Sequence, residues 1–208
     1  MNVHDAMSQI AEIRQRMAWT VTFRGYRAST TALTGVIAIA AGIVQSWSQP
    51  VDGFDVHDFL AIWFIAAMAG IVIVATGFLL RRGENANGHI AGALTLAAVE
   101  SLVPCLVAGA LVTYAIVFNQ AFNAIGLLPG LWMILFSLGI FASRRLLPRA
   151  IFIAAGYYML CGLVVLTLRP AQAFSPWTMA SVFGIGQMIT AGILYLTLER
   201  PAARGESP

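Results

Sequence analysis

The sequence contains no lysine, and charged residues of any kind are scarce. Only 10% of its 208 residues are charged, whereas a typical soluble domain has about 25%. Hydrophobic residues make up 59% of the chain, and the mean hydropathy is +0.81. Because so few charges cannot cover a water-soluble surface, we expect an integral membrane protein.

Cysteine and histidine are also few, which excludes several kinds of site. The two cysteines, Cys105 and Cys161, both lie within apolar runs and predict neither a secreted disulfide framework nor a zinc site. None of the three histidines falls in the middle of an apolar run, which disfavours a pair of axial haem ligands inside a helical bundle. We therefore expect no metal and no cofactor.

Enzyme signatures and nucleic-acid signatures are missing as well. The chain has no HExxH, GxSxG or P-loop motif, and no Ser/His or Asp/Asp pair within an apolar run. Its net charge is +3, but the arginines are spread among the ends of apolar runs and do not gather on one soluble face. The sequence thus predicts a protein without catalytic activity and without a nucleic-acid partner.

Long apolar runs dominate what is present. We expect an all-α integral membrane protein in which residues 29–198 form a bundle of six transmembrane helices and residues 199–208 form a short cytoplasmic tail. The predicted spans are 29–47, 59–80, 89–118, 127–142, 150–168 and 177–198. Their connections are short, so consecutive spans should be antiparallel neighbours.

The arginines predict the orientation of the bundle. Eleven of the twelve basic residues lie on one side of the expected spans, and only Arg169 lies on the other. Basic residues accumulate on the cytoplasmic side, so we expect both termini in the cytoplasm. Exclusive use of arginine is compatible with a high-GC bacterial genome, which favours a bacterial inner membrane. Four tryptophans near the opposite side predict an aromatic belt: Trp47, Trp63, Trp132 and Trp177.

Residues 1–28 form the expected N-terminal helix and its lead-in to the first span. Residues 3–24 are too polar to cross a bilayer, but their apolar side chains recur at spacings of three and four, as on one stripe of a helix. Acidic residues come early and basic residues late, which suits the helix dipole. We expect an amphipathic helix on the cytoplasmic surface that uses Arg14, Arg16, Trp19, Arg24 and Arg27. Two roles stay open: an anchor on the lipid bilayer, or a docking helix for a soluble partner or a second copy.

The most informative residue is Glu100, because it is the acid inside an expected span. It lies roughly 16 Å along the helix from His89, close to the centre of a hydrocarbon layer about 30 Å thick. Pro104 follows four residues later and cannot donate a hydrogen bond to the carbonyl of residue 100. A carboxyl group and a freed carbonyl oxygen at one position predict a proton or cation site.

A second interpretation of Glu100 stays open. The carboxyl group could be protonated and hydrogen-bonded to a neighbouring helix, serving assembly alone. In either case it needs polar partners, and four candidates in the expected spans are Ser101, Tyr157, Tyr158 and Gln187. Ser137 and Thr34 are further polar groups in reach of the bundle interior.

Small residues recur at four-residue intervals in several spans, which allows another backbone to approach closely. The expected packing residues are Ala93, Ala97, Cys105 and Gly109 in the third span, Ala38 and Gly42 in the first, and Gly184 in the sixth. These contacts could form within the bundle or between copies, so a homo-oligomer stays open.

On the outer side, His57 and three nearby aspartates could bind a cation, but aspartate before a helix more often caps it, and we favour capping. For the whole protein, the leading hypothesis is transport or conduction of a small solute or ion, proton-linked through Glu100. The alternative is a non-catalytic sensor or accessory subunit that docks a cytoplasmic partner through its N-terminal helix.

Overall fold

The structure is a computed structural model, and it describes residues 28–48, 55–82, 88–118, 122–143 and 147–200. Side chains are described for these residues apart from 78–82, 88–100, 122–123 and 198. The expected surface helix, with Arg14, Arg16, Trp19, Arg24 and Arg27, lies outside the described residues.

Within the described ranges the chain contains helices and no strand, which confirms the predicted all-α class. The longer helices are α2 (Ala28–Ser48), α3 (Val56–Arg82), α4 (Gly88–Phe118), α6 (Leu128–Ala142), α7 (Ile151–Leu166) and α9 (Pro176–Leu194). The short helices are α5 (Phe122–Ile125) and α8 (Pro170–Ala173), and a π-helix, η2 (Tyr195–Glu199), continues α9.

Four segments in the described part of the chain are long and apolar enough to cross a membrane: Ala28–Ser48, Val56–Gly77, Ser101–Phe118 and Pro176–Thr197. Helices α6 and α7 are also apolar but shorter, with 15 and 16 residues. At about 1.5 Å per residue each of the two covers roughly 22–24 Å, less than the hydrocarbon thickness of about 30 Å.

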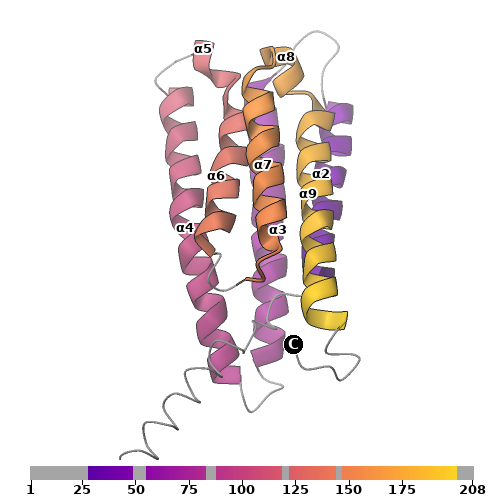
Figure 1. Cartoon of the computed structure of the whole chain (residues 1–208). Helices are drawn as coiled ribbons and strands as arrows, with labels where there is room; N and C mark the ends of the chain where they lie inside the picture. The colour runs from indigo at the N-terminus through magenta and orange to yellow at the C-terminus, as the bar shows by residue number, and fades with distance from the viewer. Residues whose placement is uncertain (1–27, 49–54, 83–87, 119–121, 144–146, 201–208) are drawn as a thin grey trace, which may run out of the picture.

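The long helices run side by side along one axis, and α5 and α8 lie together at one end (Figure 1). The closest pairs are α2 with α9 and α6 with α7, while α3 packs on α2 and α4 packs on α6. In the second pair a Cβ added to Gly130 would lie 2.9 Å from the carbonyl oxygen of Gly162, and the reverse distance is the same. Only glycine at both positions lets α6 and α7 approach this closely.

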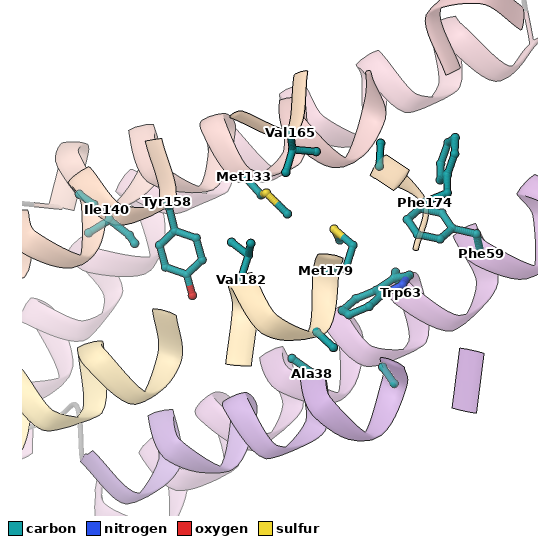
Figure 2. Packing of buried hydrophobic residues seen from close by; sticks show 14 of the residues in the cluster. Ala38, Phe59, Trp63, Met133, Ile140, Tyr158, Val165, Phe174, Met179 and Val182 are labelled. Atoms are coloured by element: carbon teal, nitrogen blue, oxygen red, sulfur yellow. The ribbon is translucent and has the colours of Figure 1, made fainter. Parts of the chain in front are cut away.

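Aromatic and sulfur-containing side chains fill the interior (Figure 2). Phe59 of α3 sits between Trp132 and Phe174, with ring centroids 5.9 and 4.8 Å away. Further along the axis, Phe136 contacts both Tyr158 and Phe183, with centroids 4.9 and 5.6 Å away. The Phe59–Trp132 pair is stacked and the other three pairs are edge-to-face or tilted, geometries in which aromatic rings pack closely.

The tryptophans divide into two groups. Trp47 and Trp177 are 82% and 58% exposed, as residues of an aromatic belt would be. Trp63 is buried, and Trp132 is partly buried and donates its indole N–H to Thr113 Oγ1 at 2.8 Å. The expectation that all four form a belt is therefore corrected, because two of them satisfy their N–H groups inside the bundle.

Candidate functional site

Helix α4 carries the acid on which the sequence analysis centres. The backbone of Glu100 belongs to this helix, and its side chain lies outside the described side chains. Pro104 stands inside α4 and is exposed, and the helix continues through it to Phe118. The carbonyl of residue 100 therefore lacks the N–H that an ordinary residue at position 104 would supply.

A hydrogen bond between α4 and α6 fixes the level of position 100 along the bundle. Ser101 Oγ lies 2.8 Å from Ser143 Oγ, and Ser143 is the residue that ends α6. The Ser143 hydroxyl also donates to the carbonyl of Gly139 at 3.0 Å. Position 100 is thus level with the end of α6, and 18 residues, or about 27 Å, from Phe118.

The expectation that Glu100 lies close to the centre of a hydrocarbon layer stays a prediction, and the structure adds the level of position 100 against α6. That expectation measured depth from His89, at the start of the apolar run. In the structure α3 and α4 both extend beyond the end of α6, which is the shortest of the longer helices (Figure 1). Against α6, position 100 lies near one end.

The register of α4 separates a packed face from an exposed face. The face toward α6 includes Cys105 and Gly109: Cβ atoms built on Gly139 and Gly109 lie 3.4 Å from Cys105 Cβ and 3.7 Å from Leu135 Cδ1. The opposite face holds exposed side chains at Pro104, Val107, Leu111, Tyr114 and Phe118. These positions follow residue 100 by 4, 7, 11, 14 and 18 residues. The backbone position of residue 100 therefore belongs to the exposed line of α4.

The expected polar partners of Glu100 lie in other helix contacts. The Tyr158 hydroxyl donates to the carbonyl of Phe183 at 3.4 Å, in the contact between α7 and α9, and the Tyr157 ring lies against Tyr158. Gln187 lies in the contact between α2 and α9, where its Cβ is 3.0 Å from a Cβ built on Gly35. Ser137 Oγ donates to the carbonyl of Ala155 at 2.7 Å, and Thr34 Oγ1 donates to the carbonyl of Thr31 at 2.7 Å.

The small residues of α2 and α9 face one another. A Cβ added to Gly42 would meet the Cβ of Ala180, and one added to Gly184 would lie 2.8 Å from Ile39 Cγ1. Ala38 is buried between these positions. On α4, Cys105 and Gly109 pack toward α6, whereas the side chains of Ala93 and Ala97 lie outside the described ones.

A buried polar network, which the sequence did not predict, centres on Gln45. This side chain is 2% exposed, and its Nε2 donates to the carbonyl of Phe174 at 2.9 Å. The indole N–H of Trp63 donates to Gln45 Oε1 at 2.7 Å. An isolated amide within an apolar run is the signal that could have identified it. The network ties α2 to α3 and to the loop that precedes α9.

At the same end of the bundle, Asp55 caps α3. Its Oδ1 accepts a hydrogen bond from the backbone N–H of His57 at 2.7 Å and lies 3.2 Å from His57 Nδ1. The hydrogen bond from the backbone N–H lowers the pKa of the Asp55 carboxyl below its ordinary value. Capping is therefore the observed role of this carboxylate, as the sequence favoured.

The chain matches no protein-family model, no curated protein and no solved structure.

Proposed function

We propose that the protein is a polytopic protein of a bacterial inner membrane, with six spans and both termini in the cytoplasm. Its partner would be the lipid bilayer. The exposed face of α4 would contact either lipid or a second copy of the chain. The long apolar helices and the one-sided arginines support this assignment. We further propose a non-catalytic sensor or accessory subunit that docks a cytoplasmic protein through residues 3–24.

The packing of the interior is the observation that favours this role over transport through the bundle. A conducting path needs a polar lining, but the described interior consists mainly of aromatic rings, methionines and aliphatic side chains. Among the described residues, each buried side-chain nitrogen or oxygen has a hydrogen-bond partner. The hydroxyl groups of Ser137 and Tyr158 both donate to backbone carbonyls of neighbouring helices. These hydrogen bonds hold the helices together and leave the two donors unavailable to a solute.

The test compares the full chain with a variant that lacks residues 1–24, each purified from its native membrane after cross-linking. We expect a cytoplasmic protein to be captured by the full chain and lost from the truncated one, while both bundles melt at similar temperatures. Equal capture by the two proteins would refute docking through this segment.

A second candidate function, proton-linked transport of a small solute or ion, is supported by the freed carbonyl of residue 100 on an otherwise apolar helix. This path would run along the exposed face of α4, outside the packed interior. Its test is a pH-driven or ion-driven flux measurement in proteoliposomes with the native chain and Glu100→Gln. Transport predicts flux that the substitution abolishes, and equal flux in the two proteins would refute a role for Glu100.

A further inference from the structure

The start of α2 is held by the far end of the chain. The first N–H groups of a helix have no acceptor within the helix, and α2 has no acidic residue in its first turn to supply one. The backbone N–H of Ala28 donates instead to Glu199 Oε1 at 3.1 Å, across 171 residues of sequence. A carboxylate is a favourable partner there, because a helix N-terminus carries partial positive charge.

The face of α9 that packs on α2 follows a regular stripe, Ala180, Gly184, Gln187 and Ala191. The stripe continues with Leu194, which packs with Ala28 and Ala191, and in an uninterrupted α-helix the position after that is residue 198, seven residues beyond Ala191. Residue 199 would then lie about 100° around the helix, away from the stripe. An ordinary α-helix would therefore turn Glu199 away from α2.

The π-helix η2 removes this mismatch. The N–H of Arg200 bonds to the carbonyl of Tyr195, five residues earlier, so the turn holds one residue more than an α-turn. One additional residue winds the register back by about 100°. Glu199 consequently takes the angular place of residue 198, in line with Ala191 and directed at the start of α2.

We propose that Glu199 is a positioning residue whose carboxylate, aimed by η2, clamps the start of α2 against the end of α9. The clamp fixes the position of Ala28, the first residue of α2, against the end of η2. This inference rests on the proposed docking role of the N-terminal segment. It adds a means of regulating that docking. Release of Glu199 would loosen the start of α2, the helix to which the docking segment is joined.

The direct test is amide exchange measured residue by residue by NMR on the full chain in lipid nanodiscs. In Glu199→Ala the amide of Ala28 should exchange about tenfold faster or more, because its hydrogen-bond acceptor is gone. Glu199→Gln should give a smaller acceleration, since the amide oxygen still accepts but the charge is lost. Thr197→Val is the matched control, because Thr197 lies in η2 and bonds only within its helix, to the carbonyl of Ile193.

Two outcomes would overturn the clamp. Unchanged exchange at Ala28 in both Glu199 variants would show that the contact holds nothing. Acceleration that extends equally to the middle of α2, at Ala38, would show general loosening of the bundle and no local clamp.

The role of η2 has its own pair of variants. Deleting Leu196, an exposed residue, should return η2 to α-helical register with the glutamate still on the stripe, so slow exchange at Ala28 should persist. Inserting one alanine after Leu194 should turn the glutamate by about 100° and accelerate exchange as Glu199→Ala does. The opposite result for either variant would refute aiming by the π-helix.

The regulatory part is tested by capture of the cytoplasmic partner with Glu199→Ala. We expect the captured amount to change at least twofold while residues 1–24 are intact. If Ala28 is released and capture is unchanged, the regulatory role is refuted. If truncation of residues 1–24 leaves capture unchanged, the docking function fails instead, and exchange at Ala28 still reports on the clamp by itself.

Discussion

The indole N–H of Trp63 in α3 donates to the side-chain oxygen of Gln45 in α2, with the two atoms 2.7 Å apart and both side chains buried. The Nε2 group of Gln45 in turn donates a hydrogen bond to the carbonyl of Phe174, in the loop before α9. One amide therefore joins three separate parts of the chain at one end of the bundle. In a low-dielectric interior, each of these groups would be costly to leave unpaired.

Replacing Gln45 with leucine should therefore destabilise the protein. The substitution removes the acceptor of the Trp63 N–H and the amide donor to the Phe174 carbonyl, a loss of about 1–3 kcal/mol in unfolding free energy. Unfolding by SDS titration or by heat measures this loss of stability. Ser46→Ala is the neighbouring control, because the exposed Ser46 hydroxyl bonds only to the carbonyl of Ile43 in its own helix. Equal stability of Gln45→Leu and the native chain would contradict a structural role for the network.

The close approach of α2 and α9 predicts opposite effects for two glycine substitutions. Gly42→Ala should destabilise by about 1–3 kcal/mol, because the new methyl group would collide with Ala180. Gly192→Ala should be neutral or stabilising by up to about 1 kcal/mol, because nothing lies within 4 Å of a Cβ there and alanine favours the helix. Melting temperatures in one detergent give the comparison, and a larger loss at Gly192 would show that the two helices do not pack this way.

A packed interior predicts that water-soluble reagents cannot reach it. In a background of Cys105→Ala and Cys161→Ala, we expect Ser137→Cys to resist a charged maleimide, since Ser137 is fully buried. Ser48→Cys, at the exposed end of α2, should react within minutes and serves as the control. Labelling of position 137 at the rate of position 48 would instead indicate a water-filled path, and would favour transport through the bundle.

The cap at Asp55 predicts a pH dependence of known sign. The pKa of this carboxyl is lower in the folded protein than in the unfolded chain. The cap therefore stabilises the folded state fully at pH values above the unfolded pKa of about 3.9, and this contribution is lost as the pH falls through the folded pKa. At pH 7 the native chain should have a higher melting temperature than Asp55→Ala, and this difference should shrink below about pH 4. Asp55→Asn, which can cap but does not titrate, should keep a constant difference from Asp55→Ala. A difference that widens on acidification would contradict this role.

The sequence by itself determined the helices. Long apolar runs, bounded by arginines, aspartates and prolines, predict helices close to the observed α2, α3, α4, α6, α7 and α9, because both length and apolar character are local properties. The small residues of α2 and α9 could also be identified, since their spacing is that of one helix face. The cap at Asp55 depends only on the next few residues, so it too was predictable.

Tertiary structure decided which helix ends are level and which faces meet. The length of its own run predicts a central position for residue 100, and only the bond between Ser101 and Ser143 shows that it is level with the end of a shorter neighbour. The inward turn of Trp63 follows from the place of Gln45 on another helix, which no local pattern contains. The turn that directs Glu199 toward Ala28 depends likewise on a helix 171 residues away. These contacts join distant parts of the chain, so only the assembled bundle could determine them.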